Sequence, residues 1–344
     1  MRVLHVINRL GYGGAERLLY NFILHAQKHY PEVDIEVCCL LEEGMLGGQL
    51  RQKVIIIHNL NSKKWDIIRV VRGLYKIIKV SRYDIVHVHL FPSLYYTWVV
   101  SLFFDSPRYV YTEHSTNNRR RKIPLLNIFE HLIYGSYDKI VANSIETKYS
   151  LSSWIKLGDK ISVIENGVPI PAIQKKNYKI TGIPKLLFIG RLTPAKGVDI
   201  AIEAVRILLR RGTEVELTIV GDGPQRKSFE RMAKGLPVRF VGFQESIETY
   251  MISHDILLIP SRWEGFGLVA IEGLMAGMPI VAASVDFLKA NIVDGKYGLL
   301  FKPGDPKDLV NKIKEILSSE GRACSKKRIR RMAAGVFYAQ LRRA

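Results

Sequence analysis

Short apolar runs alternate with stretches of helical spacing along this chain, and the series starts twice. The first series has runs at residues 3–7, 35–40, 55–60, 85–90, 109–112, 139–143 and 161–164, and the second has runs at 185–189, 216–220, 239–241, 255–260, 279–282 and 298–301. Strands that alternate with helices form parallel sheets, because a parallel connection must cross over and a helix fills that crossover. The pattern predicts an α/β chain with two doubly wound, Rossmann-like domains.

The length of the chain and one unpatterned segment indicate where the domains divide. A chain of 344 residues exceeds what one hydrophobic core usually supports. Residues 168–184 are rich in proline, lysine and polar residues and lack both periodicities, which is typical of a linker. We expect an N-terminal domain over residues 1–170, a C-terminal domain over 171–325 and a basic C-terminal segment over 326–344. Two such domains would face a central cleft that closes by hinge motion.

Two glutamates stand eight residues apart around a glycine-rich turn. The turn follows an apolar run and precedes a helical stretch at 268–276, so it lies where open α/β sheets bind ligands. Free N–H groups at a helix start attract anions, and a carboxylate accepts hydrogen bonds from sugar hydroxyls. A coincidence of two surface glutamates is the alternative, which the glycines disfavour. The segment contains Glu264, Gly265, Phe266, Gly267, Leu268 and Glu272.

Two further motifs offer groups for a phosphate-containing ligand. Gly13 and Gly14 lack a Cβ and precede a helical stretch at 15–27, so their backbone can approach a diphosphate or an acceptor. A turn that merely joins a strand to a helix is the alternative. Arg191 and Lys196 follow a strand and offer a planar fork and a mobile point charge. Single surface cations are common, so the pair is more informative than either residue.

Taken together, these motifs resemble those of the retaining, metal-independent glycosyltransferases of family 4, also called group 1. The matching segments keep the family's order over most of the chain, at residues 11–16, 111–114, 166–168, 189–197, 220–224 and 264–272. The resemblance implies the GT-B fold, in which two Rossmann-like domains face a central cleft and a terminal helix crosses back to the first domain. It implies a nucleotide diphosphate-sugar as donor and no cofactor.

The resemblance also implies the roles of single residues. His114 would contact the transferred sugar or the acceptor, and Glu264 would bind hydroxyls of the donor sugar. Glu272 would bind the ribose, with Gly242 and Phe243 near the base. The catalytic residues are then His114 and Glu264, and the donor-binding residues are Gly13, Gly14, Arg191, Lys196, Gly242, Phe243, Glu264, Gly265, Phe266, Gly267, Leu268 and Glu272.

The resemblance further implies that the sugar keeps its anomeric configuration. No residue stands out as a covalent nucleophile like the paired carboxylates of retaining glycosidases. We therefore expect a same-face displacement in which the leaving phosphate helps to deprotonate the acceptor hydroxyl. An Asp-x-Asp motif is missing, so we expect no metal. Arg191, Lys196 and helix-terminal amides would neutralise the leaving group.

The histidines and cysteines leave alternatives open. His87 and His89 alternate on one face of the run at 85–90, near its carboxyl end. That position admits a metal or acceptor site, although a hydrogen-bonded, partly buried histidine is the commoner outcome. The three cysteines, two of them adjacent, make neither a disulfide framework nor metal-ligand spacing.

The formal net charge of +19 exceeds what one diphosphate requires. Seven basic residues lie between Lys63 and Arg82 among apolar residues at helical spacing, and a second basic cluster at 119–122 precedes an apolar stretch at 123–129. Such charges usually mark a solvated face, yet basic clusters beside apolar residues also bind anionic membranes. We expect an anionic membrane surface as a partner. Nucleic acid is not expected, because neither a binding module nor an aromatic stacking pattern is recognised.

The sequence predicts no membrane-spanning segment. The best candidate, residues 90–104, is 15 residues without a charge, which suits a buried helix better than a span of about 20. The N-terminus reads as a first strand that runs into a glycine turn rather than as a signal peptide. We expect a cytoplasmic protein that is peripheral at the inner face of the cell membrane.

The predicted function is transfer of a sugar from a UDP-sugar, or from GDP-mannose, to a glycan or lipid-linked acceptor in surface polysaccharide biosynthesis. Two alternatives remain open: a nucleotide-sugar epimerase of the same fold, and a non-catalytic sugar-nucleotide-binding protein at the membrane. The chain departs from the family at residues 284–291, where relatives have paired glycines and a glutamate. That loop bears on the identity of the donor.

Overall fold

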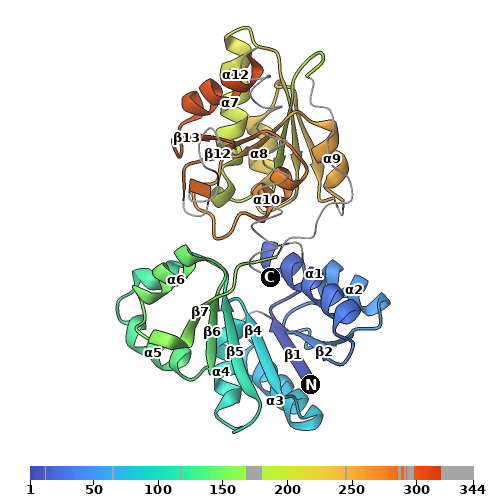
Figure 1. Cartoon of the computed structure of the whole chain (residues 1–344), viewed down its shortest axis with the longest axis vertical. Coiled ribbons are helices and arrows are strands. Elements are labelled where there is room, and N and C mark those ends of the chain that lie inside the picture. The colour runs from blue at the N-terminus through green and yellow to red at the C-terminus, as the bar shows by residue number, and fades with distance from the viewer. Residues whose placement is uncertain are drawn as a thin grey trace. The chain divides into compact units, whose positions relative to one another are not determined.

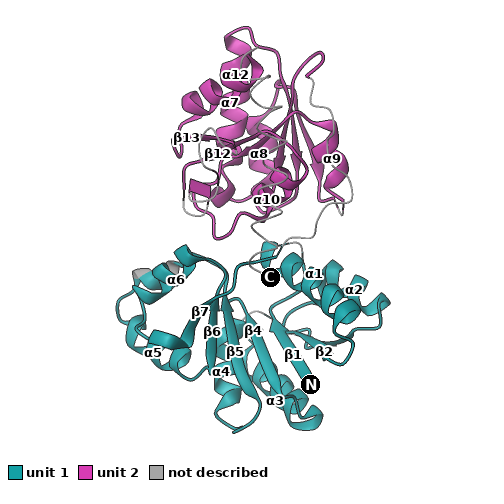
Figure 2. Cartoon of the chain, viewed as in Figure 1, with its two compact units in different colours: residues 1–167 teal, residues 168–344 magenta. Residues whose placement is uncertain are grey.

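The structure is a computed structural model that describes residues 1–11, 13–63, 66–116, 118–167, 180–244, 246–285, 288–289, 292 and 298–318 (Figure 1). The chain divides into two compact units, Met1–Gly167 and Val168–Ala344 (Figure 2). Each unit has its own parallel sheet with helices on both faces. The prediction of two doubly wound α/β domains is therefore confirmed.

Unit 1 contains a seven-stranded parallel sheet with the order β3-β2-β1-β4-β5-β6-β7. Its strands are β1 (Arg2–Ile7), β2 (Asp34–Cys39), β3 (Ile56–Asn59), β4 (Ile85–His89), β5 (Arg108–Glu113), β6 (Lys139–Ala142) and β7 (Ile161–Val163). Its helices are α1 (Gly14–His29), α2 (Gly44–Gln52), α3 (Ile67–Ser81), α4 (Ser93–Ser101), α5 (Leu126–Gly135) and α6 (Ile145–Ser152), with the 3₁₀ turns η1 (Arg119–Lys122) and η2 (Gly158–Lys160).

Alternate residues of β1 pack in two different cores. Leu4 and Val6 of β1 belong to a core that includes apolar residues of α3, α4 and α5. Ile7 of the same strand belongs to a core with α1 and α2. Because side chains alternate across a strand, His5 shares the α1 face with Ile7, where its ring meets Phe22 of α1 edge to face. This alternation brings several histidines onto one face of the sheet.

Unit 2 contains a six-stranded parallel sheet with the order β10-β9-β8-β11-β12-β13. Its strands are β8 (Lys185–Ile189), β9 (Glu216–Val220), β10 (Val238–Gly242), β11 (Ile256–Ile259), β12 (Ile280–Ala283) and β13 (Leu299–Phe301). Its helices are η3 (Pro194–Lys196), α7 (Val198–Arg210), α8 (Arg226–Met232), α9 (Glu248–Ser253), α10 (Leu268–Met275) and α12 (Pro306–Leu317). One core packs against α7, α8 and α12, and a second against α9 and α10.

The predicted elements agree with the observed ones to within one or two residues at their ends. Each apolar run forms a strand, and the predicted helices at 15–27 and 268–276 are α1 and α10. Within residues 90–104 lies α4, which packs on the sheet, and no described helix is long and apolar enough to cross a membrane. The linker residues 168–179, the segment 326–344 and parts of the 284–291 loop lie outside the described residues.

Candidate active site

The sheet of unit 2 changes direction between β8 and β11. The chain winds outward from β8 to β9 and β10 on one side and to β11, β12 and β13 on the other. Loops that leave the carboxyl ends of two such strands diverge, and ligands bind in the crevice between them. The loop after β8 carries Arg191 and Lys196, and the loop after β11 carries Glu264. The structure thus brings motifs about 70 residues apart in sequence to one edge of the sheet.

Lys196 and Glu264 form a direct ion pair across these two loops. Lys196 Nζ donates to Glu264 Oε2 at 2.5 Å, and the same oxygen accepts a hydrogen bond from Ser261 Oγ at 3.2 Å. The Glu264 side chain is 12% exposed and that of Lys196 is 30% exposed, so the pair is partly shielded from water. Arg191 is exposed on the loop after β8. Two cations and a hydrogen-bonded carboxylate therefore lie on neighbouring loops.

Arg262 holds the two loops together, and the sequence analysis missed it. Its guanidinium binds both carboxylate oxygens of Asp199 at 2.6 and 2.9 Å and donates to the carbonyl of Pro194. The Arg262 backbone N–H donates to the carbonyl of Ala195 at 2.8 Å. Because these bonds reach both sides of Lys196, they fix where its side chain starts. The only sequence signal was an arginine two residues before Glu264.

Two glycines are required by the backbone at this site. Gly197 has φ 66°, and a Cβ there would lie 1.9 Å from the carbonyl oxygen of Pro260. Gly267 has φ 65° and is the N-cap of α10. Both conformations belong to the left-handed region that glycine adopts without strain. The turn at Gly197 therefore brings the loops after β8 and β11 close together, and the turn at Gly267 starts α10.

The glycine-rich segment divides into buried and accessible parts. Phe266 is buried in a small apolar cluster with Ile271, Met275 and Leu268, so its ring anchors the turn. Glu272 is half-buried on α10. Gly242, with φ 74°, ends β10, and its carbonyl accepts from the N–H of Gly221 at the end of β9. Phe243 follows it and is half-buried.

In unit 1 the glycine turn caps α1. Gly13 is the N-cap residue of α1 with extended backbone, and its carbonyl accepts from the N–H of Arg17 at 2.9 Å. A Cβ on Gly13 would collide with the carboxylate of Glu16. Gly14 is the first residue of α1, and Tyr12 lies outside the described residues. The turn follows β1, which is one of the two strands at the change of direction in this sheet.

Four histidines lie close together beside this change of direction in the sheet of unit 1. His5 of β1 lies opposite His87 of β4 in the strand register. His5 Nδ1 lies 3.0 Å from His89 Nε2, and His89 Nδ1 lies 3.3 Å from His114 Nε2. Burial is the main cause that lowers the pKa of all four, to about 4 for His87 and about 3 for His114. The sequence analysis singled out His87, His89 and His114 but missed His5, whose alternation with Ile7 was the available signal.

Three of these rings are also close enough to approach one metal ion. His5, His87 and His89 each place a ring nitrogen within 4.8 Å of the others. Imidazole nitrogens suit zinc and other late first-row metals rather than magnesium. The nitrogens of His5 and His89 that face each other already lie at hydrogen-bonding distance, and His87 Nε2 lies 2.7 Å from Thr112 Oγ1.

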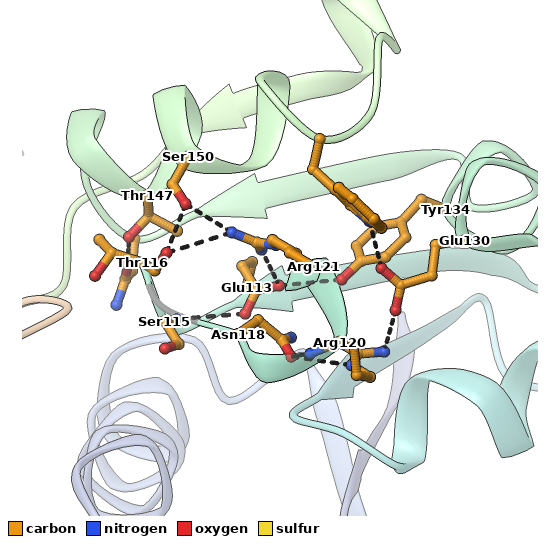
Figure 3. Close-up of polar contacts among 12 residues, drawn as sticks. Glu113, Ser115, Thr116, Asn118, Arg120, Arg121, Glu130, Tyr134, Thr147 and Ser150 are labelled. Atoms are coloured by element: carbon orange, nitrogen blue, oxygen red, sulfur yellow. Dashed lines mark hydrogen bonds and ion pairs between the residues drawn. The ribbon is translucent and has the colours of Figure 1, made fainter. Parts of the chain in front are cut away.

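His114 follows directly after a buried glutamate that anchors its loop. Figure 3 shows the polar contacts of this glutamate, Glu113. Glu113 is 4% exposed. Its Oε2 accepts from Arg121 Nη2 at 2.9 Å and from the hydroxyl of Tyr134 at 3.0 Å, while its Oε1 accepts from the N–H of Ser115. Arg121 Nη1 in turn donates to Ser150 Oγ at 2.7 Å. The contacts of Glu113 therefore fix the residues on both sides of His114. These contacts lie on the face of the sheet opposite to the histidines.

The side chains of Arg120 and Arg121 are largely buried rather than exposed, as was expected for the basic cluster at 119–122. Arg120 pairs with the fully buried Glu130, and its guanidinium lies 4.3 Å from the ring centre of Phe91. The side chains of Arg120 and Arg121 are 12% and 10% exposed. The prediction that these two face an anionic membrane is wrong, because each forms an ion pair with a buried carboxylate. The side chains of Arg119 and Lys122 lie outside the described residues.

Two family models match consecutive halves of the chain. Residues 12–170 match "Glycosyltransferase Family 4" and residues 169–334 match "Glycosyl transferases group 1". The chain belongs to the group 1 glycosyltransferases. The predicted family and enzyme class are therefore confirmed, and the match favours transfer over the epimerase and non-catalytic alternatives.

Several known proteins resemble the chain over most of its length. An uncharacterized glycosyltransferase of Methanocaldococcus jannaschii is 29% identical over 78% of this chain and 76% of its own. An uncharacterized protein in the cps region of Klebsiella pneumoniae is 29% identical over 72% of both chains. The crystal structure of HepE from Anabaena, in complex with UDP and glucose, superposes with a TM-score of 0.77 at 20% identity, covering 99% of each chain. At that identity the likeness shows the shared GT-B fold.

Proposed function

We propose that the chain is a retaining, metal-independent glycosyltransferase that moves a sugar from a nucleotide diphosphate-sugar to a glycan or lipid-linked acceptor. The observation that carries the proposal is the Lys196–Glu264 pair where the sheet of unit 2 changes direction, with Arg191 on the same loop as Lys196. A diphosphate needs cations and a sugar needs a carboxylate that binds hydroxyls, and both kinds of group occur there.

In this mechanism the charge that develops on the leaving diphosphate is neutralised by side chains. Lys196 has three N–H donors, so it binds a phosphate oxygen while it keeps its bond to Glu264. Arg191 adds a planar fork, and the backbone N–H groups at the start of α10 add partial positive charge. Glu264 binds hydroxyls of the donor sugar, Glu272 binds the ribose, and Gly242 and Phe243 lie near the base. Gly13 and Gly14 at the start of α1 approach the diphosphate or the acceptor.

We favour a UDP-sugar donor, with GDP-mannose as the second candidate. HepE, a relative in fold, is described in complex with UDP and glucose, which supports a uridine nucleotide. The relative in the Klebsiella cps region supports a role in surface polysaccharide biosynthesis. The basic face of α3 supports an acceptor at an anionic membrane, with the protein peripheral at its cytoplasmic side. Arg69, Arg72, Lys76, Lys79 and Arg82 are all exposed there.

The test is a donor screen followed by site variants. Thermal shift with several UDP-sugars and GDP-mannose identifies the donor, since a ligand at 100 times its dissociation constant adds about 2.7 kcal/mol of stability. With that donor, Arg191→Ala and Lys196→Ala should each lower kcat/KM by roughly 100-fold, as the loss of a preorganised charge does elsewhere. Lys185→Ala, at the opposite end of β8, is the control.

Three outcomes would contradict the proposal. Near wild-type turnover in both Arg191→Ala and Lys196→Ala would remove the phosphate site. Activity that is abolished by a chelator and restored by magnesium would remove the metal-independent mechanism. An inverted product, read from the anomeric coupling constant by NMR, would remove retention.

A further inference from the structure

Three of the four histidines form a continuous row rather than separate buried residues. His5 Nδ1 and His89 Nε2 are 3.0 Å apart, and His89 Nδ1 and His114 Nε2 are 3.3 Å apart. The rings of His5 and His89 lie nearly parallel, with centroids 5.3 Å apart. His87 lies beside this row but bonds to Thr112 instead. The row therefore has three members, with His5 at its buried end and His114 at its half-buried end.

Each member of the row carries one proton at neutral pH. Burial penalises the charged imidazolium, and two adjacent imidazolium rings would also repel each other. A neutral imidazole has its proton on either Nδ1 or Nε2, so one nitrogen donates and the other accepts. A hydrogen bond between two such rings needs one donor and one acceptor. The row can therefore point in only two directions.

The buried end of the row decides between these directions. His5 Nε2 is buried and has no hydrogen-bond partner among the described residues. If the row pointed toward His5, this nitrogen would carry an N–H group with nothing to donate to. If the row points away from His5, the same nitrogen is a bare acceptor. In protein backbones, buried N–H groups without a partner are rarer than under-satisfied carbonyl oxygens, and by the same reasoning we take the second direction as the more stable one.

We propose that His89 is a positioning residue that holds His114 in the Nδ1–H tautomer, so that His114 meets its ligand as a hydrogen-bond donor. In this arrangement His5 Nδ1–H donates to His89 Nε2, and His89 Nδ1–H donates to His114 Nε2. The proton of His114 is then on Nδ1, the ring nitrogen that does not face His89. The proposal rests on the proposed function only in taking His114 as a contact of the sugar or the acceptor.

The tautomer limits what His114 can do in the reaction. Its Nε2 lone pair is occupied by His89, and its Nδ1 already carries a proton. His114 therefore donates to an oxygen of the ligand and does not take the proton of the acceptor hydroxyl. That proton passes to another group, which agrees with its transfer to an oxygen of the leaving phosphate as the new glycosidic bond forms and the old bond to the diphosphate breaks.

The tautomer can be read directly by NMR without any substrate. Long-range ¹H–¹⁵N correlation spectra of the full chain, labelled with ¹⁵N-histidine, separate protonated from bare ring nitrogens. The variant His114→Gln assigns the His114 signals. We expect a protonated Nδ1 and a bare Nε2 on His114 in the wild-type protein at pH 7.5. A protonated Nε2 on His114 would overturn the proposal, whatever the enzyme's activity is.

A pair of variants then separates the role of His89 from general packing. His89→Phe keeps a ring of similar size but breaks the row, so we expect both nitrogens of His114 to shift toward the average of two exchanging tautomers. His87→Phe changes a neighbouring ring on the same strand but leaves the row intact, so the His114 signals should keep their wild-type pattern. An unchanged His114 tautomer in His89→Phe would overturn the positioning role.

A bound metal ion is the competing explanation of the cluster. It would be held by one ring nitrogen each of His5, His87 and His89, which lie within 4.8 Å of one another. Dialysis against zinc, followed by metal analysis, should give no binding that His5→Phe removes. One zinc per chain in the wild type that is lost in His5→Phe would overturn the proposal. His25 and His29 on α1 have ring centroids 4.3 Å apart, so both proteins should carry His25→Ala to remove this surface pair.

Discussion

At the residue scale, the Lys196–Glu264 pair sets what a donor must do on binding. A diphosphate approaches the ammonium group that already donates to Glu264, so in the proposed mechanism the two anions share the three N–H donors of Lys196. Ser261 offers the carboxylate a second donor at 3.2 Å. The sequence predicted both charges at the site but not their contact, because 68 residues separate them and only the folded sheet brings their loops together.

The two motif glutamates should separate in their kinetic effects. We expect Glu272→Gln to raise KM for the donor with little change in kcat, because a ribose contact is equally strong in ground and transition states. Glu264→Gln should lower kcat by about 100-fold, because in the proposed mechanism that carboxylate binds the sugar on which charge develops. Ser261→Ala, which keeps the carboxylate but removes one hydrogen bond to it, is the control. Small, equal effects of both glutamine variants would mean that the pair is structural.

The buried histidines predict a pH dependence of stability. In the unfolded chain a histidine titrates near pH 6.5, whereas burial holds the pKa of His5 and His89 well below that value. Between these pKa values the unfolded state binds protons that the folded state does not. The free energy of unfolding should therefore fall as pH drops below about 6.5, by at most about 1.4 kcal/mol per pH unit for each such histidine.

Urea unfolding of variants between pH 7 and pH 5 tests this dependence. His89→Phe should flatten the slope, because it removes one group that takes up a proton on unfolding. His131→Phe changes an exposed histidine of α5 and should leave the slope as it is. Identical slopes in the two variants would show that the cluster does not control the acid sensitivity.

At the element scale, the βα loops carry the site because glycines let them pass close to one another. Gly197 illustrates this for the loop after β8, where a Cβ would meet the carbonyl of Pro260 after β11. We expect Gly197→Ala to destabilise the protein by well over 2 kcal/mol, since it adds a backbone collision to the left-handed strain of about 1 kcal/mol.

Gly212 is a matched control for this substitution. It has a similar φ of 71°, yet a Cβ there would meet nothing within 4 Å. Gly212→Ala should therefore cost only the strain of about 1 kcal/mol. Urea denaturation of both variants measures the difference. Equal destabilisation would show that the loops adjust without cost and that Gly197 does not hold them in place.

The positions of the strands and helices could be predicted from the sequence, but the exposure of the charged segments could not. The pattern of apolar residues reflects which side chains are buried, so strands such as β8 and helices such as α10 could be located from the sequence. A run of basic residues is usually solvated, and the sequence gives no sign of a distant buried partner. The available signal was indirect: Glu130 is the only acidic residue between 123 and 135, in an otherwise apolar stretch. It pairs with Arg120, so this member of the expected surface cluster is largely buried instead.

At the scale of the whole molecule, the excess of positive charge has to be assigned to a surface. Arg120 and Arg121 do not contribute to a charged surface, because each pairs with a buried carboxylate. The face of α3 carries exposed cations beside the exposed Ile67 and Ile68. On α5, Leu125, Ile128 and Leu132 near its start and middle are also exposed. Because α3 and α5 both pack on the same face of the sheet of unit 1, one side of this unit combines cations with apolar side chains.

This combination predicts salt-sensitive binding to anionic membranes. A cation near such a surface contributes about 1 kcal/mol, so changing Arg72, Lys76 and Lys79 to glutamine should weaken binding to acidic vesicles by roughly 100-fold. Raising the salt should release the wild-type protein, because screening shortens the reach of these charges to about 8 Å near physiological ionic strength. Co-sedimentation with vesicles that contain phosphatidylserine measures both effects.

The control for the membrane prediction makes the same change of charge in unit 2. Lys227, Arg231 and Lys234 are exposed on and just after α8, and their change to glutamine lowers the net charge equally. If only the total charge mattered, the two triple variants would lose the same affinity for vesicles. We expect the α8 variant to bind as the wild type does, because membrane contact needs cations that lie beside exposed apolar side chains. Equal loss in both variants, or binding that neither salt nor the α3 variant changes, would contradict a docking surface on unit 1.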